Sequence, residues 1–194
     1  MGSFSASRTT VRGTSNIEGR QVSANTKSGA GVISTLNGLR PVINIVTLNN
    51  VTTTTIQVAL KGLKSKNDVD DIIGLGAGGH ARLCKITAAE MGQIFKISMS
   101  CTELPTASSN AGRDIDLRSA SNLTRIYDND LSGGTSLIAA GGNWALGKTI
   151  EQLVTVPTVN HGLYLTTGAT HTGDSVYTAG QLVITLYGHK LLTA

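Results

Sequence analysis

The segment 142–149 reads Gly-Asn-Trp-Ala-Leu-Gly-Lys-Thr and satisfies the P-loop pattern G-x-x-x-x-G-K-[ST]. In a true P-loop, backbone amides surround the phosphates, the lysine neutralises them and the hydroxyl holds Mg²⁺. The loop must also open a helix, but residues 149–156 are rich in Thr, Ile and Val and end at Pro157. No apolar strand ending in Asp follows. We interpret the segment as a glycine-rich turn around a packed Trp144, with nucleotide binding through Lys148 as the less favoured alternative.

A second glycine pattern, GxGxxG, occurs at residues 74–79. A dinucleotide site needs a strand before these glycines, a helix after them and an acidic residue about 20 positions further on. A polar loop precedes this segment, and the strand-like residues 81–87 follow it. The pattern therefore indicates a glycine loop rather than a cofactor site.

The segment Asp128–Gly133 copies the first half of an EF-hand calcium loop. Ala139 stands where that loop requires a bidentate Glu, and no flanking helices are indicated. We expect an Asx-turn, in which the side chains bond their own backbone, with a Ca²⁺ ion at this turn as the open alternative. The acidic residues Asp68, Asp70 and Asp71 form a similar cluster, which we expect to be solvated.

Histidine and serine spacing gives no sign of catalysis. His80, His161, His171 and His189 do not pair at a ligand spacing such as H-x-x-x-H, so the sequence predicts no zinc site. No G-x-S-x-G elbow singles out a nucleophile. We therefore expect no metal site, no cofactor and no enzymatic activity.

The composition favours protein contacts over other partners. Charged residues make up only 14% of the chain, against about 25% in ordinary soluble domains. Thr, Ser, Asn and Gly replace them, which suits sheets whose outer faces pack against other subunits. Aromatic residues make up 4%, which argues against a nucleic-acid stacking platform and an aromatic sugar groove. We expect no nucleic-acid partner.

The net charge of +4 is concentrated near the N-terminus. Residues 1–31 carry a net charge of +3, because only Glu18 opposes their basic residues. Those basic residues are Arg8, Arg12, Arg20 and Lys27. The segment is rich in Ser, Thr and Gly and has no apolar periodicity, so it predicts a flexible basic arm. We assign to this arm the binding of an acidic protein surface.

Neither a membrane segment nor a disulfide framework is indicated. No apolar run approaches the length of a transmembrane helix. The polar N-terminus lacks the apolar core of a signal peptide, so we expect synthesis in a cytosol-like compartment. Cys84 and Cys101 lie in alternating segments beside apolar residues, which predicts two reduced, packed thiols.

The rest of the chain, residues 32–194, predicts an all-β domain: a β-sandwich, jelly-roll-like, closed by its last strand. That strand, residues 178–188, alternates Leu182, Ile184 and Leu186 with polar residues, and Gly180 and Gly188 mark its ends. Residues 94–103 alternate in the same way. The nearly continuous apolar run 41–48 predicts a central, doubly covered strand. Other expected strands are 52–63, 81–87, 114–117, 123–127, 137–140, 154–159 and 163–166.

Asn49 and Asn50 separate the first two expected strands and predict a hairpin turn. Thr87 and Glu90 fit a capping box, but Gly92 follows so soon that only one helical turn is expected.

Part of the sequence resembles small virion structural proteins of tailed bacteriophages, particularly marine ones. The resemblance rests on the run 94–106, on Arg113–Leu117, on residues 141–144 and on the closing segments 164–167 and 177–188. It covers roughly residues 70–188 and leaves the arm uncovered. Such proteins are head-associated β-sandwich components without enzymatic activity.

The resemblance implies a capsid decoration (cement) protein on the capsid exterior, made in the host cytoplasm. Its expected partners are the major capsid protein and copies of itself, and a homo-oligomer is expected. The arm would lie over an acidic capsid surface or a neighbouring subunit. Two alternatives stay open: another virion position, such as a tail or fibre-base component, and a glycan-binding module. The glycan-binding module would need Trp144, Tyr164 and Tyr187 for stacking.

Overall fold

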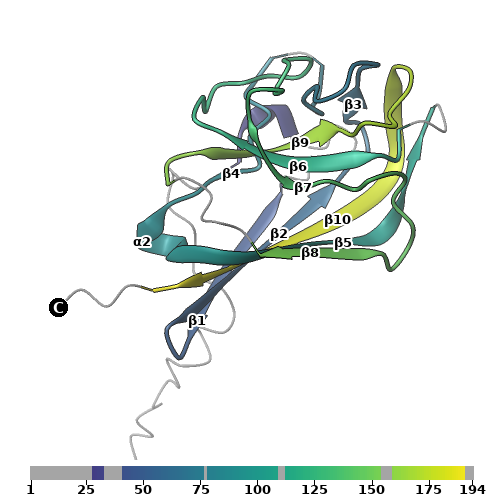
Figure 1. The fold of residues 1–194 in the computed structure, drawn as a ribbon. Helices are drawn as coiled ribbons and strands as arrows, with labels where there is room; N and C mark the ends of the chain where they lie inside the picture. The colour runs from purple at the N-terminus through teal and green to yellow at the C-terminus, as the bar shows by residue number, and fades with distance from the viewer. Residues whose placement is uncertain (1–27, 33–40, 77, 109–111, 154–158, 191–194) are drawn as a thin grey trace, which may run out of the picture.

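The computed structural model describes residues 28–32, 41–76, 78–108, 112–153 and 159–190. These residues form an all-β sandwich of two antiparallel sheets packed face to face (Figure 1). The six-stranded sheet has the order β1-β2-β10-β5-β8, with the short β3 also paired to β10. The four-stranded sheet has the order β4-β9-β6-β7. The predicted fold class is confirmed.

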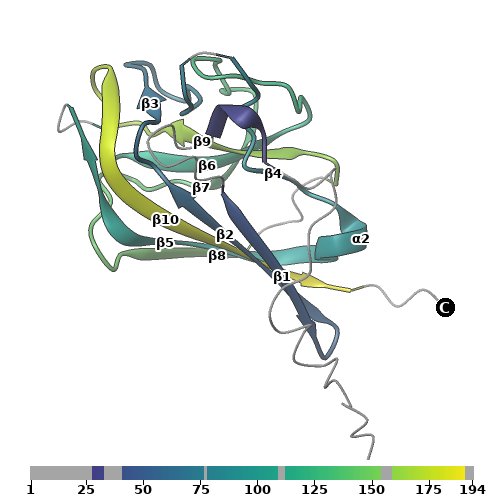
Figure 2. The same ribbon diagram turned by 180° about the vertical axis from the view of Figure 1, so that it is seen from behind.

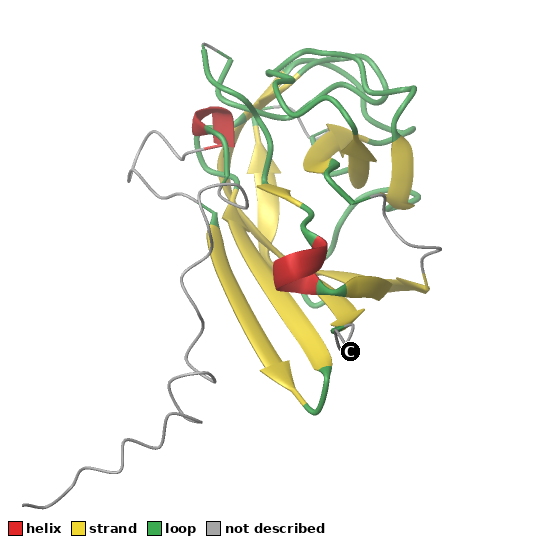
Figure 3. Ribbon diagram, turned by 90° about the vertical axis from the view of Figure 1, so that its left-hand side faces the viewer, coloured by secondary structure: helices red, strands yellow, loops and turns green. Residues whose placement is uncertain are grey.

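The larger sheet consists of β1 (Val42–Leu48), β2 (Val51–Ala59), β3 (Lys64–Ser65), β5 (Gln93–Ala107), β8 (Thr149–Leu153) and β10 (Ser175–His189). The smaller sheet consists of β4 (Cys84–Lys85), β6 (Ile115–Ala120), β7 (Thr135–Ile138) and β9 (Gly162–Thr167). The helical elements of the described residues are the 3₁₀ turn η1 (Ala30–Val32) and the single helical turn α2 (Ala88–Met91). Most of the long loops lie at the end of the sandwich opposite the β1–β2 turn (Figure 3).

One continuous core fills the space between the sheets. Leu182, Ile184 and Leu186 of β10 are at most 1% exposed, as their alternation predicted. Residues of the smaller sheet, including Leu117 and Leu165, belong to the same core. Burying a side chain of this size contributes about 1.5–3 kcal/mol, so the alternating strands supply most of the force that holds the sheets together.

The last strand is the central strand of the larger sheet. It pairs with β2 on one side and with β5 on the other. Gly180 and Gly188 lie within β10 and not at its ends, which corrects the sequence prediction. Gly180 has φ +126°, and a Cβ there would lie 2.8 Å from the Pro105 Cα. It stands where the β10–β5 register shifts, so this glycine permits a bulge rather than ending the strand.

The first two strands form the predicted hairpin. Asn49 and Asn50 have φ angles of 48° and 65°, the left-handed conformations that a two-residue type I′ turn requires. However, β1 lies at the edge of the sheet, so the prediction of a central, doubly covered strand is wrong. Val42 and Leu48 are 50% and 67% exposed. An apolar run shows that a strand is rich in hydrophobic residues, but not which partners cover it.

Two further strand predictions differ from the structure. Residues 123–127 form turns, because asparagine side chains on either side of this segment bond its backbone. Asn122 Oδ1 accepts a hydrogen bond from Thr124 N, and Asn129 Oδ1 accepts one from Ile126 N. Within residues 81–87 only Cys84–Lys85 pairs as a strand. The prediction for 154–159 falls largely outside the described residues, of which 159 is a turn residue.

Residues 28–32, which include the end of the predicted arm, lie against the sandwich. Gly29 N donates to Arg82 O at 2.7 Å, and Gly31 N donates to His80 O at 2.9 Å. Val32 is 1% exposed and belongs to the core. The backbone around His80 leaves no space for a Cβ at Gly29 or Gly31. This short segment is therefore part of the folded body.

Candidate functional site

The face of the larger sheet that points away from the smaller sheet has no covering element among the described residues (Figure 1). Figure 2 shows the strands of this sheet from behind. We call it the outer face. Its cross-strand rows follow from the pairing registers. The three central rows are Val42–Gln57–Val183–Ser100–Thr149, Asn44–Thr55–Thr185–Ser98–Glu151 and Val46–Thr53–Tyr187–Lys96–Leu153. A further row, Ala59–Gln181–Glu103, follows towards the loop end of the sheet.

The centre of the outer face carries hydroxyl, amide and small apolar groups and almost no uncompensated charge. Its three rows contain two charged residues, Lys96 and Glu151, which form an ion pair at 2.8 Å. The hydrogen bond to Glu151 raises the pKa of Lys96. Lys96 Nζ also lies 5.3 Å from the centre of the Tyr187 ring. The pair therefore neutralises itself, and the face is suited to another protein surface rather than to a charged ligand.

The hydroxyl groups of this face bond to one another across the strands. Ser100 Oγ and Thr149 Oγ1 are 2.9 Å apart, and Thr102 Oγ1 donates to Gln181 Oε1 at 3.0 Å. Such cross-strand pairs hold side chains in fixed positions on the sheet. The outer face is therefore ordered before any partner arrives, which lowers the entropic cost of binding.

Both edges of the same sheet expose apolar side chains. On β1, residues 42–48 carry no charge and pair regularly with β2 over seven consecutive positions, so the opposite edge of β1 stays open within the described chain. On β8, Leu153 is 80% exposed. Natural proteins usually protect open edges with charges, prolines or bulges. The absence of such protection on β1 favours a contact with protein.

The predicted binding residues of the arm, Arg8, Arg12, Arg20 and Lys27, lie outside the described residues. Their role in binding an acidic surface stays a prediction.

The P-loop pattern forms a turn that leads into a strand. Thr149 begins β8, where a phosphate-binding loop would open a helix. Lys148 Nζ donates to Ala140 O at 2.9 Å and lies 5.3 Å from the centre of the Trp144 ring. Trp144 is 1% exposed, and its Nε1 donates to Ile115 O at 2.8 Å. The lysine holds the loop together, and the prediction of a turn around a packed tryptophan is confirmed.

The GxGxxG segment lies in a loop, and its first residue, Gly74, forms two backbone hydrogen bonds with Lys64. Lys64 N donates to Gly74 O at 2.6 Å, and Gly74 N donates to Lys64 O at 3.1 Å. The residues that follow it, His80–Leu83, are not helical. The geometry of a dinucleotide site is therefore not formed by the described part of this loop.

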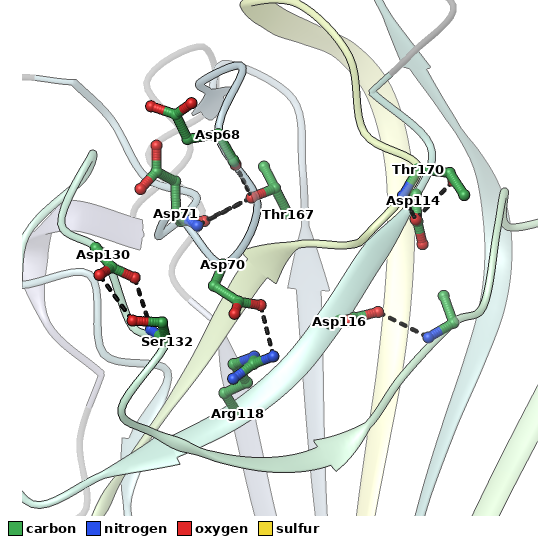
Figure 4. A network of polar contacts seen from close by, with 11 residues as sticks. Asp68, Asp70, Asp71, Asp114, Asp116, Arg118, Asp130, Ser132, Thr167 and Thr170 are labelled. Carbon is green, nitrogen blue, oxygen red and sulfur yellow. Dashed lines mark hydrogen bonds and ion pairs between the residues drawn. The ribbon is translucent and has the colours of Figure 1, made fainter.

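The acidic turn at residues 128–133 is an Asx-turn, as predicted. Asp130 accepts from Ser132 N at 2.6 Å and from Ser132 Oγ at 2.8 Å (Figure 4). These hydrogen bonds lower the pKa of Asp130. In the described residues no group of three or more His, Cys, Asp or Glu side chains is arranged to hold a metal ion.

For the neighbouring acidic cluster, the prediction of solvated side chains holds for the exposed Asp68 but is wrong for Asp70 and Asp71. Asp70 forms an ion pair with Arg118 at 2.5 Å, and both side chains are largely buried. Asp71 is 5% exposed. Burial, together with the charges of Asp128 and Asp68, raises the pKa of Asp71 to about 6. These residues pack at the end of the sandwich because β6 and β9 bring Arg118 and Thr167 beneath them (Figure 4).

Two more aspartates, which the sequence did not single out, are buried and hydrogen-bonded. Asp114 accepts from Thr170 N and Oγ1, both at 2.7 Å. Asp116 accepts from Ala140 N at 2.7 Å. Both carboxylates tie loops to the start of β6, so their role is to hold the fold (Figure 4).

The two thiols are buried and free, as predicted. Burial raises the pKa of Cys84 to about 12, which keeps it protonated and unreactive near neutral pH.

The stacking residues of the glycan-binding alternative are not available as a set. Trp144 and Tyr164 are at most 1% exposed, and Tyr164 donates its hydroxyl to Asn122 O at 2.7 Å. Tyr187 alone of the three reaches a surface, on the outer face. A single tyrosine beside Lys96 does not make the aromatic platform that this alternative requires.

No helix of the described residues has the length and apolar character needed to cross a membrane. Comparison with protein-family models, with curated proteins and with solved structures finds no match to this chain.

Proposed function

We propose that this chain is a non-enzymatic virion structural protein, a capsid decoration (cement) protein that associates with copies of itself and attaches to the major capsid protein. The observation that carries the proposal is the outer face, an ordered sheet surface with one self-neutralised ion pair in its central rows and apolar residues at both edges. The resemblance to virion proteins of tailed phages supports the same function. A tail or fibre-base position would use the same surface.

The size of the outer face supports a protein partner. Five strands about 4.8 Å apart, each contributing residues that rise ~3.3 Å, give an area on the order of 500 Å². A stable interface needs about 800 Å² per partner. The outer face supplies much of this area, and the basic arm would add the rest by ordering on an acidic capsid surface, as disordered segments do when they bind.

Repetition would strengthen the attachment. A decoration protein binds a lattice of identical sites, so contacts that are weak singly become strong when copies are linked. The exposed edge of β1 gives copies of the chain a place to pair, because its backbone donors and acceptors face outward. In the proposed assembly, copies of the chain therefore contact one another through their sheet edges. The outer face and the arm contact the capsid shell.

The test is the substitution Thr185→Arg, with Thr172→Arg as the matched control. Thr185 lies in the middle of the outer face, between Thr55 and Ser98, whereas Thr172 is exposed in the loop before β10. Both variants should keep the sandwich, as judged by circular dichroism. Thr185→Arg should reduce binding to empty capsid shells more than tenfold, because it places an unpaired charge in the contact.

Sedimentation of shells with bound protein measures the binding, and analytical ultracentrifugation measures self-association. The Thr172→Arg variant should bind like the parent chain. Equal binding by the parent chain and by Thr185→Arg would contradict the assignment of the outer face as the attachment surface.

A further inference from the structure

A polar pocket of about 170 Å³ lies at one end of the smaller sheet, away from the outer face. Its walls come from the end of β6, from the loop that follows it, from the turn before β7 and from His161 just before β9. Neither the outer face nor the arm accounts for this pocket.

Three buried polar atoms of residues that line the pocket have no hydrogen-bond partner in the described structure. They are Ser119 Oγ, Arg125 Nε and His161 Nδ1. Ser119 is 1% exposed. Leaving a buried polar group unpaired costs about 1–3 kcal/mol, so a hydrogen bond from a ligand or from ordered solvent to any of these three groups would be stabilising.

Arg125 is the one arginine or lysine among the described residues that line the pocket. Its side chain forms no ion pair within the described residues, and neither Asp nor Glu is among the lining residues. The nearby carboxylate of Asp130 interacts with Arg125 electrostatically, but its hydrogen bonds come from Ser132 and not from Arg125. A guanidinium that makes no direct ion pair keeps N–H donors for an external anion.

Other groups around the pocket add donors and fix its shape. Asn122 Oδ1 accepts from Thr124 N and Oγ1, so the amide NH₂ of Asn122 is the part left for a ligand. A Cβ at Gly134 would lie 3.0 Å from Ser119 O, which shows that the turn before β7 packs closely against β6. The pocket is therefore formed before binding.

We propose that this pocket binds a small oxyanion, that is, a phosphate, sulfate or carboxylate group, through Arg125, Ser119 and His161. The volume is below the roughly 300–1,000 Å³ of sites for drug-sized ligands, so it accommodates one such group rather than a large molecule. The group can be a free ion or part of an acidic glycan or peptide, since the chemistry recognised is the same.

The test is titration of the full-length chain with sodium phosphate, sodium sulfate and sodium acetate at constant ionic strength, followed by amide NMR. A fourth titration uses a sulfated oligosaccharide. The expected result is saturable binding of at least one anion, with the largest shifts at Ser119, Arg125 and His161. Tighter binding of the oligosaccharide than of sulfate would identify a glycan as the source of the group.

Arg125→Gln should weaken this binding by more than about tenfold, and Lys190→Gln, an equal charge change at the far end of β10, should leave it unchanged. Ser119→Ala provides a second variant: its hydroxyl has no partner, so the substitution should weaken binding without lowering the melting temperature. Non-saturable shifts spread over the basic surface, or unchanged binding in both pocket variants, would overturn the proposal.

Discussion

At the scale of single residues, the buried aspartates differ according to their partners. Asp114 and Asp116 each accept hydrogen bonds from backbone amides. Burial raises the pKa of Asp116 even so, although the bond from Ala140 N opposes that effect. The carboxylate of Asp71 accepts no hydrogen bond within the described residues, and burial, together with the charges of Asp128 and Asp68, raises its pKa to about 6. A carboxyl whose pKa is higher in the folded state than in the unfolded chain destabilises the fold once it ionises.

The first prediction concerns Asp71→Asn. At pH values well below 3.8, the ordinary pKa of an Asp side chain, Asp71 is protonated in both states and has no effect. As the pH rises from 4 to 6, the unfolded chain loses its proton first, so the parent chain loses stability. At pH 8 Asp71→Asn should therefore be more stable than the parent chain by about 1–2 kcal/mol. Urea unfolding at pH 4 and pH 8 measures the difference.

The control for this experiment is Glu103→Gln, an exposed carboxylate on β5, which should change stability little at either pH. A stabilisation by Asp71→Asn that is the same at both pH values would show that ionisation is not the cause.

The second prediction concerns Lys148, the lysine of the P-loop pattern. Lys148→Ala removes the hydrogen bond to Ala140 O and the contact with Trp144, and should lower the free energy of unfolding by about 1 kcal/mol. Neither form should bind ATP in isothermal titration calorimetry. If the parent chain bound ATP and Lys148→Ala abolished that binding, the result would support the nucleotide-binding alternative. Lys190→Ala is the control for removing an exposed lysine.

At the scale of the elements, the long central strand β10 depends on glycines inside it. Gly180 stands at a register shift between β10 and β5 and has φ +126°. Gly188 stands at another shift, where the carbonyl of Met91 at the end of α2 approaches it. The two glycines therefore let β10 twist along its length while it stays paired with β2 and β5. A regular strand of the same length, without such shifts, would follow this twist less well.

The third prediction follows from Gly180. Gly180→Ala should lower the free energy of unfolding by about 2–3 kcal/mol, because the new Cβ meets Pro105 and the φ angle is unfavourable for alanine. Gly133→Ala is the matched control: its φ is not positive, and a Cβ there meets nothing within 4 Å. Thermal and urea unfolding should show little change for the control. An equal effect of the two substitutions would contradict the role of the bulge.

At the scale of the whole molecule, the sandwich separates surfaces of different character. The outer face and both edges of the larger sheet are nearly uncharged, whereas the basic residues of the arm account for most of the net charge. The oxyanion pocket opens at the end of the smaller sheet. The domain can therefore bind protein on one sheet while the loops of the other sheet remain accessible.

The fourth prediction compares two truncations. Removing residues 1–27 should leave the melting temperature unchanged and weaken attachment to capsid shells, because the basic residues of the arm are lost. Removing residues 1–32 should also lower stability by about 2–3 kcal/mol, since Val32 is buried in the core. If the chain 28–194 bound capsid shells as tightly as the full chain does, the role of the arm would be refuted.

Much of the fold is predictable from the sequence because strand alternation is local. The burial of Leu182, Ile184 and Leu186 follows from their spacing, and the hairpin follows from Asn49-Asn50. The edge position of β1 does not, because it depends on which strands pair. The pocket was also missed: Ser119, Arg125 and His161 are far apart in sequence, and no spacing rule connects them.

The sequence by itself determined that this chain is an all-β sandwich with packed thiols, a glycine-rich turn around Trp144 and a basic N-terminal segment. Each of these depends on residues close together in the chain, whose side-chain direction and turn geometry are local properties. The tertiary structure alone decided that β1 is an open edge, that Asp71 is buried and that Ser119, Arg125 and His161 line one pocket. These features arise when distant segments pack, and the free energy of that packing is not encoded in any short pattern.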